Sequence, residues 1–179
     1  MSLTLKTLFK SDLYRYCQQP YSIYVLLKGL ASSQGFRYLF FWRLKEYYGA
    51  KSLTGFLAYL FVRHYRYKYG FQIGGKIGAG FFIGHFGTII VSVNASIGKN
   101  CNIAPGVTIG RDHRGERRGS PTIGDHVWIG TNAVLVGKIV IGNDVLIAPN
   151  SFVNFDVPDH SIVVGNPARI IPRENATEG

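Results

Sequence analysis

Two histidines in this chain lie in local sequences that could present an imidazole for proton transfer. His85 stands between Gly84 and Gly87, so the backbone on both sides of it can turn tightly and leave room for a substrate. A neutral imidazole, whose ordinary pKa is about 6.5, can take a proton from a hydroxyl group at neutral pH. Taken alone, these residues fit a general base and an exposed turn histidine equally well.

His113 is the second candidate, and it lies in the polar segment 110–122. This segment holds four arginines and almost no residue that could be buried, so we expect it to loop out of the fold. A histidine there could be a base, could bind substrate, or could be a solvated loop residue. The last of these is the more ordinary outcome for a loop.

The remaining reactive side chains form no further motif. His126 follows Asp125 and is expected at an exposed corner, while His64 and His160 show no pattern. The spacing of the histidines and of Cys101 does not fit a zinc site, and Cys101 is expected to be a buried thiol. The sequence therefore predicts no metal ion, and it contains neither a nucleophile elbow nor a phosphate-binding loop.

The element that must position these groups is a repeat. From residue 71 onward a large aliphatic residue recurs at every sixth position, and a smaller apolar residue often follows it by four. An α-helix cannot keep this period on one face, whereas short strands with alternating side chains can. Three hexads form one triangular coil, so the pattern predicts a β-helix of four to five coils. The repeated positions are Phe71, Ile77, Ile83, Ile89, Val91, Ile97, Ile103, Ile109, Ile123, Ile129, Leu135, Ile141, Ile147 and Val153.

The first 70 residues differ in composition from the rest. They hold 11 Lys and Arg against 2 Asp and Glu, while residues 71–179 hold 9 against 8. Their runs lack an even period, and we expect helices broken at Pro20, Gly35 and Gly49. We divide the chain into a basic, aromatic helical region (1–70), the β-helix (71–163) and a C-terminal tail (164–179).

The basic and aromatic helical region allows several partners. It could cap the β-helix and pack against other subunits, and it could also rest on an anionic membrane surface. Nucleic acid is a weaker alternative because no recognition motif accompanies the charge. The N-terminus lacks the pattern of a secretory signal, so we expect a cytoplasmic protein with possible peripheral membrane contact.

The repeat, together with the segments PTIGDHVWIG, IGNDVLIAPNSFV and GNPARII, resembles the hexapeptide-repeat acyltransferases. The resemblance covers residues 70–173. It implies a left-handed parallel β-helix, a homotrimer, and acetyl-CoA bound as co-substrate between neighbouring subunits. It also implies that small residues of the later coils hold the pantetheine arm and that arginines meet the phosphates. The cofactor-binding candidates are Gly110, Gly130, Thr131, Ala148, Pro149, Arg169 and Arg173.

Within that group, the spacing from Gly70 to Ile123 is similar to serine acetyltransferases. This similarity makes His85 the leading candidate for the catalytic base and leaves His113 as rival or substrate-binding residue. A backbone carbonyl, or Asp112 of a neighbouring subunit, would then fix the tautomer of His85. The chain departs from the family's pattern where acidic residues or an Arg-His pair are expected, at Gly70, Gly84 and Gly119–Ser120.

These departures indicate the loss of a serine pocket. The sequence hypothesis is therefore an acetyl-CoA-dependent O-acetyltransferase that modifies a sugar hydroxyl in capsule or exopolysaccharide synthesis, as colanic-acid-type enzymes do, with a glycan or lipid-linked sugar as acceptor. A serine O-acetyltransferase of cysteine biosynthesis is the alternative within the same class of enzyme. A non-catalytic β-helix scaffold or membrane-binding trimer is the alternative of another class.

Overall fold

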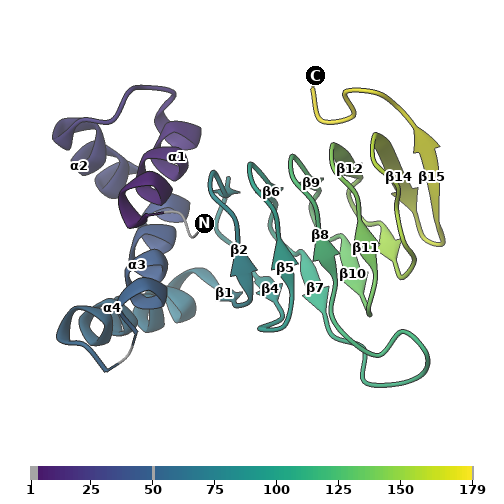
Figure 1. Ribbon diagram of the computed structural model, residues 1–179, viewed down its shortest axis with the longest axis horizontal. Helices are drawn as coiled ribbons and strands as arrows, with labels where there is room; N and C mark the ends of the chain where they lie inside the picture. Colours follow the sequence, from purple (N-terminus) through teal and green to yellow (C-terminus); the bar gives the residue numbers. More distant parts are fainter. Residues whose placement is uncertain (1–3, 50, 179) are drawn as a thin grey trace.

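The computed structural model describes residues 4–49 and 51–178, and it contains a helical part followed by a β-solenoid (Figure 1). The four helices are α1 (Leu5–Cys17), α2 (Ile23–Ser32), α3 (Gln34–Tyr48) and α4 (Leu53–Tyr69). Hydroxyl side chains cap all four N-termini, as when Ser52 Oγ accepts the N–H of Gly55 at 3.0 Å. Ser11 lies inside α1, whose N-cap is Thr4.

Three parallel sheets form the faces of the solenoid. Sheet A contains β1 (Phe71–Ile73), β4 (Ile89–Val91), β7 (Thr108–Gly110), β10 (Val134–Val136) and β13 (Phe152–Val153). Sheet B contains β2 (Lys76–Ile77), β5 (Ser96–Ile97), β8 (Thr122–Ile123) and β11 (Val140–Ile141). Sheet C contains β3 (Phe82–Ile83), β6 (Asn102–Ile103), β9 (Trp128–Ile129), β12 (Val145–Ile147), β14 (Ser161–Gly165) and the antiparallel β15 (Ala168–Pro172).

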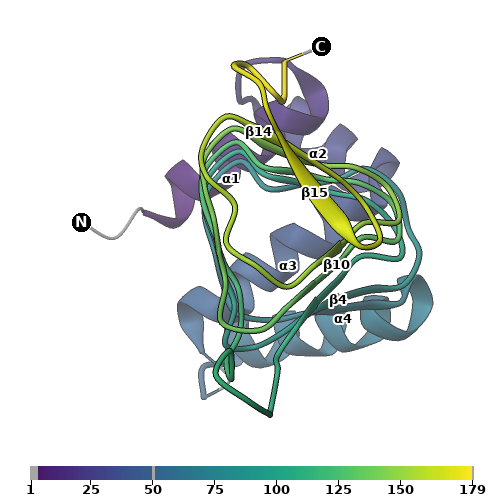
Figure 2. The same cartoon turned by 90° about the vertical axis from the view of Figure 1, so that its right-hand side faces the viewer.

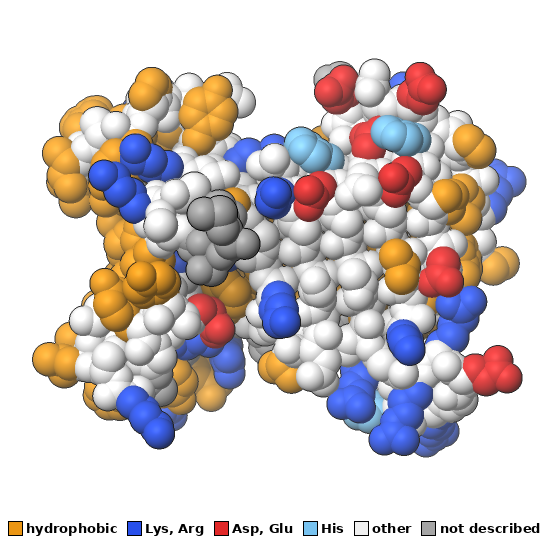
Figure 3. Space-filling view, viewed as in Figure 1, with side chains coloured by type: hydrophobic (Ala, Val, Ile, Leu, Met, Phe, Trp, Pro, Cys, Tyr) orange, Lys and Arg blue, Asp and Glu red, His pale blue; other side chains and the backbone are white. Residues whose placement is uncertain are grey.

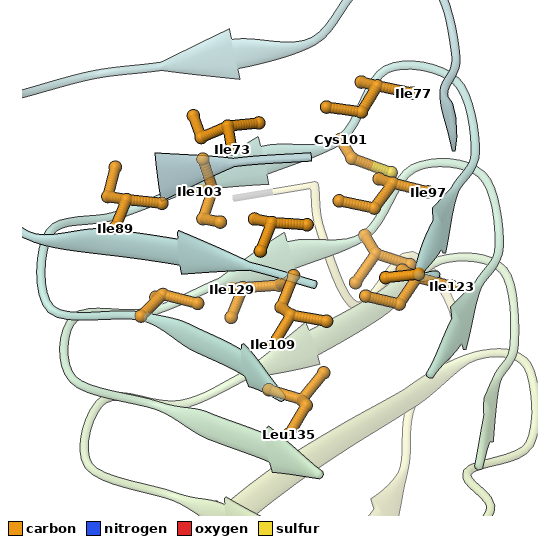
Figure 4. Packing of buried hydrophobic residues seen from close by; sticks show 14 of the residues in the cluster. Ile73, Ile77, Ile89, Ile97, Cys101, Ile103, Ile109, Ile123, Ile129 and Leu135 are labelled. Carbon is orange, nitrogen blue, oxygen red and sulfur yellow. The ribbon is translucent and has the colours of Figure 1, made fainter. Parts of the chain in front are cut away.

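The predicted left-handed parallel β-helix fold class is confirmed, with about five turns of chain. Viewed along its axis, the solenoid has a triangular outline (Figure 2). We name its edges AB, BC and CA after the two sheets that each edge joins. The repeated aliphatic residues point inward and stack in register from coil to coil, as Ile103 pairs with Ile129 (Figure 4). Cys101 is part of this core, and its burial raises the pKa of its thiol to about 11, so it stays protonated.

The helices close the open end of the solenoid at its first coil. Asp12 of α1 accepts the N–H groups of Gly80 and Phe81, and Arg43 of α3 donates to the carbonyl of Ile77 at 2.6 Å. Asp12 and Arg43 also pair with each other at 2.9 Å, and both are buried. Burial raises the pKa of Asp12, while the guanidinium and the two N–H groups oppose that effect. These side chains replace the coil that would otherwise satisfy the exposed backbone groups.

Gly35 allows α3 to lie directly against β3. A Cβ atom at this position would stand 2.1 Å from the carbonyl oxygen of Ile83. Beside it, the hydroxyl of Tyr16 accepts the N–H of Ile83 at 2.7 Å. The helical part is therefore fixed on the same strand that leads into His85.

Candidate active site

His85 lies on the CA edge, in the turn 84–88 that joins β3 to β4. Its side chain is exposed, and none of the hydrogen bonds found among the described residues involves its ring. The turn is anchored at its base, because Gly87 donates to the carbonyl of Tyr69 and Ile89 donates to that of Gly70, both at 3.1 Å. The end of α4 thereby holds the turn while the imidazole remains free to meet a substrate.

The turn of His85 is longer than its counterparts in later coils. Val91 follows Ile83 by eight positions, whereas Ile109 follows Ile103 by six. The two extra residues lie between β3 and β4, since Phe82 pairs with Asn102 while Ile90 pairs with Thr108. In the repeat, Val91 follows Ile89 by two positions instead of six, and this phase shift is a local insertion that lifts His85 away from the coil. It is the sequence signal that marks this turn.

Below His85, the CA edge is a strip of small residues. The turns of successive coils are joined by backbone hydrogen bonds, from Asn132 to the carbonyl of Pro105 and from Asn150 to that of Thr131. At about 4.8 Å per coil, the strip runs about 14 Å from the turn of His85 to the turn of Ala148. Four of the predicted cofactor-binding residues lie on it, namely Gly130, Thr131, Ala148 and Pro149.

Gly130 is required by close packing in this strip. A Cβ atom there would stand 2.7 Å from the backbone nitrogen of Pro149 in the next coil. Thr131 and Pro149 are exposed, while Ala148 is half-buried. The edge therefore presents backbone and short side chains to solvent along its length.

The other three cofactor-binding candidates lie at different places. Arg169 is exposed in β15 opposite Val164, close to the hairpin end where Gly165 donates to Ser151 Oγ, so it lies at the far end of the CA edge. Arg173 lies at the opposite end of β15, where its N–H donates to the carbonyl of His160 on the BC edge. Gly110 ends β7 on the AB edge.

The predicted loop 110–122 projects from the AB edge as expected (Figure 2). Asp112 forms a bridge with Gly119, and its Oδ1 accepts the N–H of Arg114 at 2.9 Å. His113 is exposed beside it. Because sheet A separates the AB and CA edges, Asp112 and His113 do not meet the His85 of their own chain.

The other histidines have structural surroundings. His126 and His160 occupy left-handed corners on the BC edge, with φ of 57° and 55°, in one column with Asn100 and Asp144. The ring of His160 lies 2.9 Å from Asp144. His64 is on α4, where its ring packs against Tyr65. Across the described residues, no cluster of three or more metal-ligating side chains was found.

Sequence reasoning missed the groups that position the site. Tyr69 and Gly70 anchor the turn of His85 through their carbonyl oxygens, and backbone atoms leave no residue-type signal. Asp12 and Arg43 were also missed. The signal that pointed to them is Asp12 itself, the one acidic residue in the basic sequence of α1.

Comparisons with known proteins agree with this architecture. Residues 120–154 match the family model described as bacterial transferase hexapeptide (six repeats). Serine acetyltransferase of Bacillus subtilis (strain 168) is 37% identical over 118 residues, which cover 65% of this chain and 54% of that protein. The chain thus spans about half the length of this relative.

Solved structures match over more of the chain. Neisseria gonorrhoeae serine acetyltransferase in complex with serine has a TM-score of 0.72 at 30% identity, covering 93% of this chain and 69% of that one. Serine acetyltransferase of Brucella abortus strain S19 in complex with coenzyme A has a TM-score of 0.78 at 25% identity, covering 94% and 68%.

The fold and the family model define the class: the chain is a hexapeptide-repeat transferase-type protein with a β-solenoid fold. Within this class, the relatives and solved structures that it resembles are serine acetyltransferases.

The hypothesis of a polysaccharide sugar as acceptor is therefore wrong. It rested on absent side chains at three sites, and two of these have backbone roles of their own. Gly70 is the left-handed C-cap of α4 with φ of 77°, and Gly119 has φ of 148° in its bridge to Asp112. Glycine at those positions follows from the backbone and says little about the acceptor.

Proposed function

We propose that this protein is an acetyl-CoA-dependent serine O-acetyltransferase. The observation that carries the proposal is the CA edge, where an exposed imidazole stands at one end of a strip of small residues and an arginine at the other. The similarity to structures holding serine and coenzyme A, over more than nine-tenths of this chain, supports the same assignment.

In this mechanism His85 is the general base. The imidazole takes the proton of the serine hydroxyl as its oxygen attacks the thioester carbonyl of acetyl-CoA. The tetrahedral intermediate collapses with cleavage of the carbon–sulfur bond, and the imidazolium returns the proton to the departing thiolate. The acetyl group moves directly to the hydroxyl, and the products are O-acetylserine and free coenzyme A.

The strip below His85 would hold the coenzyme. Gly130, Thr131, Ala148 and Pro149 offer a narrow path and free backbone groups for an extended thioester arm. Arg169 lies about one coil beyond Ala148, so its guanidinium is suited to the phosphate groups at the far end of the molecule. Arg173 lies on the other edge and is less suited to that role in the same chain.

We also propose that the site is completed by another copy in a homotrimer. The loop of Asp112 and His113 projects from one edge of sheet A and His85 from the other, so copies arranged around sheet A would bring a loop of one chain toward His85 of the next. Asp112 of the neighbour could then orient the imidazole, and His113 could contact the acceptor.

The departure from the family pattern at Gly84 predicts weak serine binding. An ammonium and a carboxylate group each favour a charged partner, and Gly84 provides none beside His85. Serine should therefore react with a high KM. Since acetyl-CoA is produced in the cytoplasm, we expect the enzyme to act there.

The test is thiol release from acetyl-CoA in the presence of L-serine. His85→Ala should lower kcat by about 10²–10⁴-fold, the usual contribution of a general base. His113→Ala should act mainly on KM, and the matched control His126→Ala, an exposed histidine on the BC edge, should have no effect.

Two results would overturn the proposal. Full turnover by His85→Ala with loss of turnover in His113→Ala would show that the general base is His113 in the loop 110–122. Absence of coenzyme A binding in calorimetry would identify a non-catalytic scaffold.

A further inference from the structure

Helix α4 reverses the usual arrangement of large and small side chains. Over residues 53–62 its buried side holds Gly55, Ala58 and Val62, which are small or medium in size, and a large residue, Tyr69, is buried only at its last position. The opposite, solvent-facing stripe begins with Leu53, Phe56, Leu57 and Leu60, which are 75%, 47%, 48% and 43% exposed. An ordinary surface helix buries its large apolar residues and exposes polar ones. The large side chains of α4 are therefore available to something outside this chain.

Helix α2 shows the same reversal. It buries Val25 and Gly29, while Ile23 and Leu27 on its other side are 67% and 60% exposed. Both helices belong to the end of the molecule that lies away from the solenoid. On the face shown in Figure 3, hydrophobic side chains cover more of this end than of the solenoid. No helix in the described residues is long and apolar enough to span a membrane.

The same end is strongly cationic. Among residues 4–49 and 51–70, seven cations are exposed, against one exposed carboxylate, that of Glu46. The exposed cations are Lys6, Lys10, Lys28, Lys51, Arg63, Arg66 and Lys68. Lys28 directly follows Leu27, and Lys51 lies two residues before Leu53, so basic groups border both apolar stripes.

We propose that the helical end binds the surface of an anionic lipid bilayer. Leucine and phenylalanine side chains of α2 and α4 would enter the interface, and the lysines and arginines beside them would meet lipid phosphates. A second copy packed end to end on this surface, unlike the side-by-side copies of the proposed trimer, would bring like charges together, which opposes that association. The charge therefore favours the bilayer over another copy as the occupant.

This contact leaves the candidate active site free. The helices cap one end of the solenoid, whereas the CA edge runs along the solenoid from that end toward the other (Figure 1). A bilayer at the helical end would therefore leave the strip from Gly130 to Pro149 open to solvent. The proposal does not depend on which acyl acceptor the enzyme uses.

The experiment is sedimentation of the full chain with two kinds of vesicle, phosphatidylcholine alone and equal parts phosphatidylcholine and phosphatidylglycerol. We expect binding to the anionic vesicles only, weakened by salt. The double variant Lys28→Gln/Lys51→Gln should lower partition by about fivefold per lysine. Its matched control, Lys76→Gln/Lys99→Gln, removes the same charge from the solenoid and should lower partition much less.

The apolar contribution is tested with Leu57→Ser/Leu60→Ser against Val140→Ser, which changes an exposed aliphatic residue of sheet B. The helix variant should lose most vesicle binding at unchanged thermal stability, and the control should bind like the wild type. His85→Ala should also bind vesicles normally, which separates this proposal from the catalytic one.

Several outcomes would overturn it. The proposal would be wrong if the chain bound both kinds of vesicle equally. It would also be wrong if the variants and their controls lost vesicle binding to the same extent. If wild type ignores vesicles and the leucine variant dissociates an oligomer in light scattering, the surface is a protein interface. If duplex DNA binds more tightly than vesicles and the leucine variant leaves that binding unchanged, the basic end is a nucleic-acid site.

Discussion

The two parts of this molecule use apolar residues in opposite ways. In the solenoid, every large aliphatic residue of the repeat is buried, and exposed apolar residues such as Trp128 and Val140 lie on different sheets. In the helical part, α2 and residues 53–62 of α4 bury small or medium-sized residues and expose leucine, isoleucine and phenylalanine. A repeat whose coils stack in register has one inside and one outside, whereas a helix can turn either side toward its neighbours. The six-residue period therefore predicts which residues are buried in the solenoid, whereas no such period predicts burial in the helical part.

The junction of the two parts depends on one buried charge pair. We expect Arg43→Met to lower the free energy of unfolding by about 3–5 kcal/mol, because Asp12 would stay buried without its partner. Chemical denaturation followed by circular dichroism measures this. The control Arg117→Met removes an exposed partner of Asp156 and should cost at most about 1 kcal/mol. Similar losses in both variants would show that the junction does not depend on the buried pair.

The contrast between the two parts can be measured with one substitution in each. Ile109→Ala removes a fully buried aliphatic residue of the solenoid and should cost about 2–5 kcal/mol. Leu57→Ser removes an exposed leucine of α4 and should change stability by no more than about 0.5 kcal/mol. Urea denaturation of both variants gives the comparison. A large loss in Leu57→Ser would mean that α4 is covered in the isolated protein.

Gly84 can be used to sharpen the assignment of the acceptor. A side chain fits there, since a new Cβ would touch only the ring of Phe82, at 3.2 Å. Gly84→Asp places a carboxylate beside His85 and should raise kcat/KM for serine by about tenfold, the scale of outer-shell partners. Thiol release provides the measurement. Asn175→Asp adds the same charge in the C-terminal tail, after β15, and should have no effect. An unchanged rate in Gly84→Asp would show that serine binding does not depend on this position.

The smallest effect concerns pH and the C-terminal tail. Asp144 accepts the N–H groups of Ala176 and Thr177, both at 3.0 Å, and pairs with His160. Partial desolvation acts to raise the pKa of Asp144, but these hydrogen bonds outweigh it and hold that pKa well below its usual range. The hydrogen bond to Asp144 raises the pKa of His160.

A raised histidine pKa adds stability at acidic pH that is lost as pH rises through the folded value. A lowered carboxyl pKa adds stability that is lost as pH falls toward its folded value. The tail should therefore be held best between about pH 4 and pH 6.5, the ordinary pKa values of the two groups. The protection factors of the Ala176 and Thr177 amides, in which the intrinsic base catalysis of exchange is divided out, should fall above that window, and His160→Gln should remove this dependence. Protection factors that stay constant with pH in the wild type would mean that the pair does not hold the tail.

Much of the fold was open to prediction because the hexad rule is local. The positions of Ile103 and Ile129 in the core and the loop around His113 both follow from neighbouring residues. The candidate site was only partly predictable. The two-residue step from Ile89 to Val91 marked an irregularity in the repeat, but nothing local indicated that Tyr69 and Gly70 anchor the turn of His85. The acceptor was predicted wrongly because missing side chains at glycines were weighed without the backbone conformations that require them.

The sequence alone therefore determined the solenoid, its core and the residues of its loop, because a six-residue period allows one arrangement of inside and outside. Only the tertiary structure aligned His85 with Gly130 and Ala148 along one edge and put Asp112 on another, since stacking of distant coils sets which turns become neighbours. It also decided that α2 and α4 show their large residues to solvent, because the rotation of a helix depends on what it packs against.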